Sequence, residues 1–206
     1  MIYAIALPIG RFICWLFGGL RVYNRRYMPK EGACVLVGNH LSAWDPILVA
    51  CACKDRHLTF MGKEELFRNR FTNWFFRQLG GFPIKRGGTD MTAIKTALSR
   101  LKDGWALSIF PEGTRHADAT QMQEARQGAA MLTLRSHAQL IPLAIFGRFR
   151  MLRFRKTHIV LGPPIDTAPF AAGKGDVPGL TAEIMRVVQA MQQEGVPTKQ
   201  KRKRQA

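Results

Sequence analysis

His40 and Asp45 stand five positions apart in the stretch VGNHLSAWDP, residues 37–46. A carboxylate that accepts a hydrogen bond from one imidazole nitrogen fixes the tautomer of the ring and stabilises imidazolium, so the other nitrogen is left to accept a proton. The simpler interpretation is structural, because an aspartate before Pro46 is a common start of a helix. The pattern predicts a His–Asp general-base pair, and these residues alone leave both interpretations open.

The pair has no evident protein nucleophile beside it. Ser42 is close in sequence, but the chain contains no G-x-S-x-G elbow to present it. A base without a nucleophile suits transfer to a hydroxyl that the substrate supplies. The other histidines are scattered singly and predict no metal site; they are His57, His116, His137 and His158.

A second polar group occurs in the stretch FPEGTRH, residues 110–116. Gly113 permits a tight turn, Thr114 offers a hydroxyl, and Arg115 carries a planar fork suited to phosphate. Glu112 can hold that guanidinium or steady the loop. As an isolated motif, the stretch is equally typical of a surface turn with a salt bridge.

Two further cations lie near the ends of apolar runs. Lys63 follows LTFMG, and Arg86 ends FPIKR, in which Lys85 should point the other way. In open α/β sheets, sites form at the loops that follow the carboxyl ends of strands. We therefore expect Lys63, Arg86 and Arg115 to converge on one anion.

Short apolar runs alternate with amphipathic segments along the chain. The runs predict strands at 33–38, 58–62, 82–86, 105–110, 140–146 and 157–162. The amphipathic segments predict helices at 45–54, 70–80, 89–104, 124–137 and 181–195. This order indicates an α/β fold in a single domain, with a largely parallel or mixed central sheet flanked by helices.

The two ends of the chain differ from its middle. The segment 1–28 starts with about twenty apolar residues that are interrupted by Pro8, Gly10 and Arg11, and the basic and aromatic cluster RVYNRRY follows at 21–27. They predict an N-terminal membrane-associating helical segment that inserts shallowly, and the alternative is a helix packed on the domain. Residues 29–196 form the folded domain, and 197–206 a basic disordered tail.

The formal net charge is +17, and it is concentrated near the two ends and in the stretch RFRMLRFRK, residues 148–156. Such charge seeks nucleic acid or an anionic membrane surface. No recognised nucleic-acid-binding motif accompanies it, so no nucleic acid is expected as a partner. Cys34, Cys51 and Cys53 lie in apolar runs, are predicted to be core residues, and fit a reducing cytosolic compartment.

Taken together, the blocks resemble the glycerolipid acyltransferase family, most closely the bacterial 1-acylglycerol-3-phosphate (lysophosphatidic acid) acyltransferases. NHLSAWD matches the N-H-x-x-x-x-D block, GGFPIKR the second block, FPEGTR the third, and LIPLAI the fourth. MGKEELF is also similar to the family. Pro83 departs from the aliphatic residue that many members carry. The resemblance covers roughly residues 30–165, with the blocks in the family's order.

The resemblance implies a role for each residue. His40 would be the general base that takes the proton from the sn-2 hydroxyl as it attacks an acyl thioester, and Asp45 would orient it. The acceptor's phosphate would be held by three cations, and further residues would support the site. The cations are Lys63, Arg86 and Arg115, and the supporting residues are Asn39, Glu112, Gly113, Thr114 and Pro142.

The resemblance further implies phospholipid biosynthesis at the cytoplasmic face of the inner membrane. The partners would be lysophosphatidic acid, an anionic bilayer surface, and acyl-CoA or acyl-carrier protein as donor, with no metal or redox cofactor. Glycerol-3-phosphate, another lysophospholipid or an aminoacyl lipid stay open as acceptors. A basic nucleic-acid-binding protein and a non-catalytic lipid-binding protein are the alternatives from other classes.

Overall fold

The computed structural model describes residues 7–12, 16, 19–53, 56–85, 88–111, 119–147, 156–172 and 175–197, excluding the side chains of 119–126. The strands are β1 (Leu20–Tyr23), β2 (Cys34–Gly38), β3 (Leu58–Lys63), β4 (Gly81–Ile84), β5 (Ala106–Ile109), β6 (Gln139–Phe146) and β7 (Thr157–Leu161). The helices are α2 (Asp45–Ala52), α3 (Arg70–Gln78), α4 (Met91–Lys102), α5 (Ala119–Ser136) and α6 (Val177–Glu194). Short 3-10 turns occupy η1 (Arg25–Tyr27), η2 (Glu64–Phe67) and η3 (Ala168–Phe170).

The strands form one seven-stranded sheet in the order β1-β7-β6-β2-β5-β3-β4. The pairs β2–β6, β2–β5, β3–β5 and β3–β4 are parallel, whereas β7 runs antiparallel to β6 and parallel to β1. The sheet is therefore mixed. The carboxyl ends of β2, β5, β3 and β4 lie along one edge, where the predicted site residues follow them.

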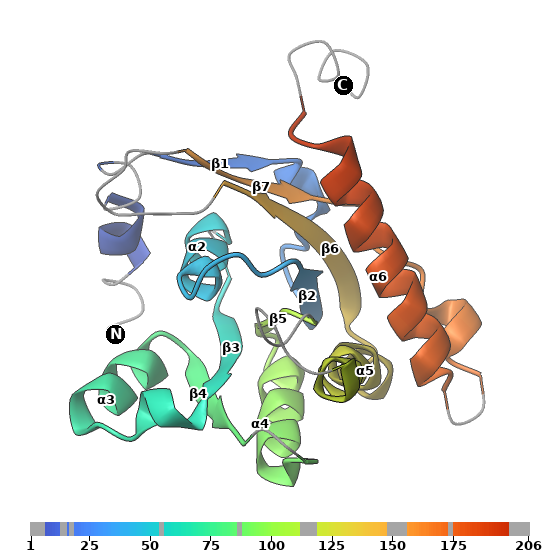
Figure 1. Ribbon diagram of the computed structural model, residues 1–206, viewed down its shortest axis with the longest axis horizontal. Coiled ribbons are helices and arrows are strands. Elements are labelled where there is room, and N and C mark those ends of the chain that lie inside the picture. The colour runs from blue at the N-terminus through green and yellow to red at the C-terminus, as the bar shows by residue number, and fades with distance from the viewer. Residues whose placement is uncertain are drawn as a thin grey trace.

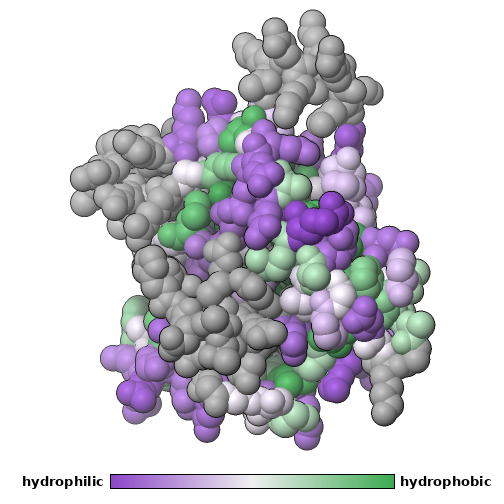
Figure 2. Space-filling view, turned by 45° about the vertical axis from the view of Figure 1, so that its right-hand side comes forward, coloured by the Kyte–Doolittle hydropathy of each residue, from purple (hydrophilic) through white to green (hydrophobic). Residues whose placement is uncertain are grey.

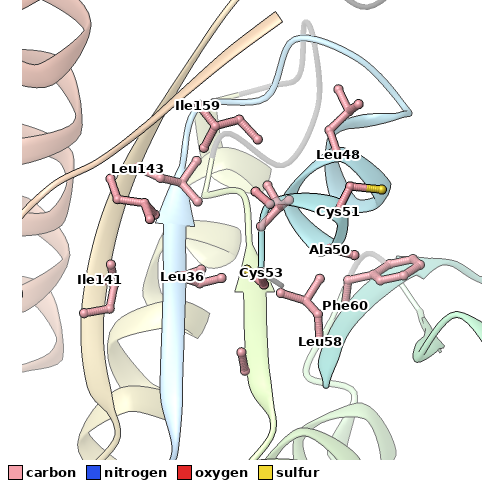
Figure 3. Packing of buried hydrophobic residues seen from close by; sticks show 14 of the residues in the cluster. Leu36, Leu48, Ala50, Cys51, Cys53, Leu58, Phe60, Ile141, Leu143 and Ile159 are labelled. Carbon is pink, nitrogen blue, oxygen red and sulfur yellow. The ribbon is translucent and has the colours of Figure 1, made fainter. Parts of the chain in front are cut away.

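Helices cover both faces of the sheet (Figure 1). One face carries α2, and its core joins Leu48 and Cys51 of that helix to Leu36, Leu58 and other strand residues (Figure 3). The other face packs on α4, α5 and α6 through a second core that includes Ala97, Ala130 and Leu180. Each face takes alternate residues of a strand, as the period of two requires.

The close approach of β2 and β6 depends on Gly38, the last residue of β2. A Cβ at this position would lie 2.6 Å from the backbone oxygen of Leu143, so a side chain does not fit without moving β6. Pro142 lies in β6 opposite Val37, and its carbonyl accepts a hydrogen bond from the Gly162 N–H at 2.8 Å. Pro142 thus lies one residue before Leu143, the first β6 residue of the β6–β7 ladder.

The predicted cysteine environment is confirmed for Cys34, Cys51 and Cys53, which are all buried. Burial raises the pKa of the Cys34 thiol to about 11 and that of the Cys53 thiol to about 12, against the lowering effect of nearby Arg56. These thiols are therefore protonated and act as small apolar core residues.

All the predicted strands and helices are present, with differences at some ends. The helices α5 and α6 begin earlier than expected, and α6 starts after Asp176, whose side chain accepts a hydrogen bond from the Gly179 N–H. Residues 7–12 are helical, but Leu20–Tyr23 is a strand, inside the segment 1–28 for which a helix was expected. Leu20 and Val22 alternate with Arg21 and pack on the α2-side core, a period-two signal that the membrane interpretation masked.

Candidate active site

The connection between β2 and α2 brings His40 and Asp45 into contact. His40 Nδ1 and Asp45 Oδ2 are 2.8 Å apart, and the Asp45 side chain is 1% exposed whereas that of His40 is 24% exposed. The backbone N–H groups of Leu41 and Ser42 donate to the same Oδ2 at 2.6 and 2.7 Å. A carboxylate oxygen that accepts from these donors also accepts from a proton-bearing Nδ1, so Nε2 is the ring nitrogen with the chemistry to accept a proton.

The start of α2 explains how the carboxylate becomes available. Asp45 is the first residue of the helix and Trp44 its N-cap, with no hydrogen bond from a capping side chain. The prediction that Asp45 caps α2 is therefore wrong, because its carboxylate turns back into the loop. The loop itself is a turn: the Asp45 N–H donates to the Ser42 carbonyl at 3.0 Å, and the Ser42 hydroxyl accepts from the Trp44 N–H at 3.3 Å.

Asn39, the residue before His40, is held in place by hydrogen bonds of its side chain. Its side-chain amide donates to the Ile145 carbonyl at 3.0 Å and accepts from the Ile145 N–H at 2.7 Å, and it is 2% exposed. The β2–β6 ladder ends at the pair Gly38 and Leu143, so the Asn39 side chain extends the pairing past the last strand residue. His40 thus follows directly on a part of the sheet that is fixed by hydrogen bonds.

Phe110 is the site residue that the sequence analysis missed. Its ring stacks on the His40 imidazole with centroids 4.7 Å apart and an interplanar angle of 17°. Phe110 directly follows β5, the neighbour of β2, so the strand that leads into FPEGTRH delivers this ring to the base. The signal available in the sequence was its place as the first residue of that block.

The structure places Lys63 at the same edge of the sheet. It is the last residue of β3, is exposed, and precedes η2. One strand, β5, lies between β3 and β2 in the sheet, so the backbone of Lys63 is about 10 Å from that of β2. The predicted residues Arg86, Glu112, Gly113, Thr114 and Arg115 lie outside the described residues.

The N-terminal residues pack on the same helix that begins with Asp45. Arg11 Nε donates to the Cys51 carbonyl at 3.0 Å, and Arg25 Nη1 donates to the Ala52 carbonyl at 2.9 Å. Both carbonyls belong to the last turn of α2, where cationic donors satisfy the free carbonyls and the helix dipole. The N-terminal segment is therefore hydrogen-bonded to the helix that begins with Asp45.

Two features are absent from the described part of the chain. In residues 7–12, 16, 19–53, 56–85, 88–111, 119–147, 156–172 and 175–197, histidine, cysteine and carboxylate side chains form no group of three or more suited to a metal ion. Within the same ranges, no helix has the length and apolar character needed to cross a membrane.

Known proteins resemble this chain in sequence and in fold. The family model described as Acyltransferase matches residues 19–146. A 1-acyl-sn-glycerol-3-phosphate acyltransferase of Bacillus subtilis is 29% identical over 164 residues, which are 78% of this chain and 81% of that protein. A lyso-ornithine lipid O-acyltransferase of Rhodobacter capsulatus is 34% identical over 108 residues, 52% of this chain and 38% of that protein.

Among solved structures, the LPA acyltransferase PlsC of Thermotoga maritima superposes with a TM-score of 0.69 at 23% identity. The match covers 96% of this chain and 81% of that chain. At this identity the likeness shows the fold, and it confirms the α/β architecture with helices on both faces of a mixed sheet.

Proposed function

The chain belongs to the Acyltransferase family, and we propose that it moves an acyl group from a thioester to the sn-2 hydroxyl of 1-acylglycerol-3-phosphate, giving phosphatidic acid. The observation that carries the proposal is the contact of 2.8 Å between His40 Nδ1 and Asp45 Oδ2 at the sheet edge. The relatives named for this reaction, such as the Bacillus subtilis protein, support the choice of acceptor.

His40 acts as the general base. Its Nε2 takes the proton of the acceptor hydroxyl while that oxygen attacks the thioester carbonyl, so a C–O bond forms. The tetrahedral intermediate then collapses, the C–S bond breaks, and the thiolate leaves with the proton that the imidazolium returns. Asp45 holds the tautomer throughout and stabilises the imidazolium. The reaction exchanges one ester for another without redox change, so it needs no redox cofactor.

The acceptor's phosphate binds to Lys63, Arg86 and Arg115, which positions the hydroxyl at Nε2. The parallel strands support this arrangement, because β3 ends at Lys63 and β4 ends at Ile84, two residues before Arg86. Glu112, Gly113 and Thr114 shape the loop that carries Arg115. Acyl-CoA and acyl-carrier protein are the two donors to compare.

The site works at the cytoplasmic face of a membrane, where the acceptor's tail stays in the bilayer. Residues Ile9, Phe12 and Leu16 are about half exposed, although Leu7 beside them is buried in the core. A segment whose inner side packs on the domain and whose outer side is apolar and exposed is typical of one that lies in the headgroup region. Its arginine contacts with α2 would hold the site close to that surface.

The test is acyl transfer by purified protein, measured with each donor and lysophosphatidic acid in mixed micelles. Replacing the base in His40→Ala should lower kcat by about a thousandfold. The matched control is His57→Ala, a histidine at the opposite edge whose ring is tilted by 32° against that of Trp105, with centroids 5.1 Å apart. Near-normal turnover of His40→Ala would disprove the mechanism.

A lyso-ornithine lipid is the second acceptor to test, since one relative carries that activity in its name. This acceptor has a carboxylate and an amine in place of the phosphate. If the protein acylates it and leaves lysophosphatidic acid unchanged, the proposed acceptor is wrong while the general-base mechanism stands.

A further inference from the structure

The segment η2–α3 exposes large apolar side chains. The exposed fractions are 69% for Phe71, 49% for Trp74, 38% for Phe75 and 44% for Leu66. By contrast, the face turned toward the viewer in Figure 2 intersperses hydrophilic with hydrophobic side chains. A contiguous exposed apolar group of this kind marks an interaction surface.

The helix α3 has apolar side chains on two sides. Phe76 and Leu79 pack on the α2-side core, and the Phe76 ring lies 5.9 Å from that of buried Phe67. On the outer side the Phe71 ring stacks on Phe75 at 6.3 Å and lies 6.2 Å from Trp74. Phe71, Trp74 and Phe75 belong to neither hydrophobic core.

The charges beside these rings are positive. The sequence of α3, RFTNWFFRQ, contains Arg70 and Arg77 and no acid, and Arg68 precedes it, whereas Glu64 and Glu65 lie at the start of η2. Arg77 Nε donates to Asn73 Oδ1 at 2.7 Å, along the polar side of the helix. Aromatic rings flanked by arginine complement an anionic headgroup layer above hydrocarbon.

The position of the segment fits a flat partner. The turn η2 begins directly after Lys63, so its exposed Leu66 and the first turn of α3 follow the sheet edge that bears His40. Residues 7–12 and α3 lie on the same side of the molecule, at the left of Figure 1. A planar surface on that side would meet Ile9 and Phe12 together with the α3 rings, whose exposed fractions range from 38% to 69%.

We propose that η2 and α3 dock on an anionic lipid bilayer, with Leu66, Phe71, Trp74 and Phe75 in the outer hydrocarbon and Arg70 and Arg77 at the lipid phosphates. The proposal rests on the proposed function in that the acceptor is a membrane lipid. It adds a second point of attachment, independent of the N-terminal segment, and sets the orientation of the site toward the bilayer.

The direct test is quenching of Trp74 by vesicles of phosphatidylcholine and phosphatidylglycerol with brominated acyl chains. The Trp74 signal is the difference between the emission of the parent and that of Trp74→Phe. The matched control is Trp105, which lies at the amino end of β5 with Arg100 over its ring at 4.2 Å, read in the same way from Trp105→Phe. We expect the Trp74 signal to be quenched and shifted to the blue, and the Trp105 signal to be unchanged.

Two variants test the contribution to binding by vesicle sedimentation. The triple change Phe71→Ser, Trp74→Ser and Phe75→Ser should lower partition about tenfold, whereas Met91→Ser, which removes an exposed apolar residue on α4, should not. The double change Arg70→Gln and Arg77→Gln alters exposed side chains only. It should weaken binding to anionic vesicles about tenfold and leave phosphatidylcholine vesicles unaffected.

The outcomes separate docking from catalysis. Protein that stays unbound, or that binds with Trp74 unquenched, overturns the docking proposal even if acyl transfer is normal. A Trp74 shift that depends on protein concentration without vesicles identifies a second copy as the occupant, which also overturns it. If Trp74 is quenched but the protein cannot acylate lysophosphatidic acid below its critical micelle concentration, the proposed function is wrong and the docking proposal stands.

Discussion

Asp45 and Asp90 both stand at the start of a helix on the same edge of the sheet, yet their carboxylates serve different partners. Asp90 is the N-cap of α4, and its Oδ1 accepts from the N–H groups of Thr92 and Ala93, both at 3.0 Å. Asp45 accepts no capping hydrogen bond, and its Oδ2 instead receives Leu41 and Ser42 N–H and His40 Nδ1. The first carboxylate stabilises the helix ahead of it, and the second organises the loop behind it.

The difference separates an aspartate that caps a helix from one whose contacts suit the proposed catalytic role. The Asp45 side chain is 1% exposed, and its carboxylate contacts the preceding loop, which includes the imidazole of His40. Asp90 is half-buried, and its second oxygen accepts from the Lys85 N–H at 2.9 Å, which steadies the turn after β4. The residue type is the same and the positions differ by one, since Asp45 is the first residue of α2 and Asp90 the N-cap of α4, so the direction of the hydrogen bonds carries the distinction.

The sharpest way to test the difference is Asp45→Asn. Oδ2 meets all three donors, so an asparagine either keeps its oxygen at this place, where it is neutral and no longer stabilises imidazolium, or turns its NH₂ group there, which faces Nδ1 and leaves the proton on Nε2. Either orientation weakens His40 as a base, so kcat should fall by about a thousandfold or more while the protein stays folded. Steady-state kinetics beside a thermal unfolding curve would measure both.

Asp90→Asn is the matched control for this change. Asparagine is as good an N-cap as aspartate, so both turnover and stability should stay close to the parent. If the two asparagine variants lose activity equally, the distinction between the carboxylates is wrong.

The comparison also shows where sequence reasoning succeeds and stops. Short apolar runs predicted the strands around Cys34–Gly38 and Gln139–Phe146, because a strand that is buried on both faces is apolar throughout, and Asp45 before Pro46 predicted the start of the helix α2. The pairing of His40 with Asp45 was predicted from their spacing and is present. The contacts of the same carboxylate with the Leu41 and Ser42 N–H groups were not predicted, because the dihedral angles of a short turn decide them.

Contacts between distant segments were the second limit. Asn39 is 106 positions from Ile145, and the stacking of Phe110 on His40 depends on β5 lying beside β2. Strand order is set by packing of the whole domain, so no local pattern could indicate either contact. The strand β1 was missed for a different reason, since its Arg21 and Tyr23 also fit a headgroup zone.

A second prediction uses stability instead of activity. Asp45→Ala removes the acceptor of the Leu41 and Ser42 N–H groups in a nearly closed site. Each unpaired buried donor costs about 1–3 kcal/mol, so the free energy of unfolding should fall by about 3 kcal/mol. Urea denaturation would measure this loss, and a smaller loss than for Asp90→Ala would contradict the view that Asp45 organises the loop.

The smallest effect is expected for Asp90→Ala, which removes a side-chain cap and should cost about 1 kcal/mol with kcat unchanged. Hydrogen bonds from the Lys85, Ala93 and Thr92 N–H groups lower the pKa of the Asp90 carboxyl below its ordinary value of 3.8. The folded protein therefore binds this proton less readily than the unfolded chain does. The stabilisation is fully present above pH 3.8 and is lost as the pH falls through the folded-state pKa.

The pH dependence of that small difference tests whether Asp90 acts as a charged cap. Unfolding free energies of parent and Asp90→Ala should differ most near neutral pH and converge as the pH drops below 3.8. A gap that stays constant would mean that the neutral carboxyl caps equally well. Asp90 accepts a hydrogen bond from the Lys85 N–H, and Lys85 directly precedes Arg86 in the sequence. The KM for a phosphorylated acceptor should therefore also rise in Asp90→Ala while kcat holds, whereas Asp45→Asn should lower kcat.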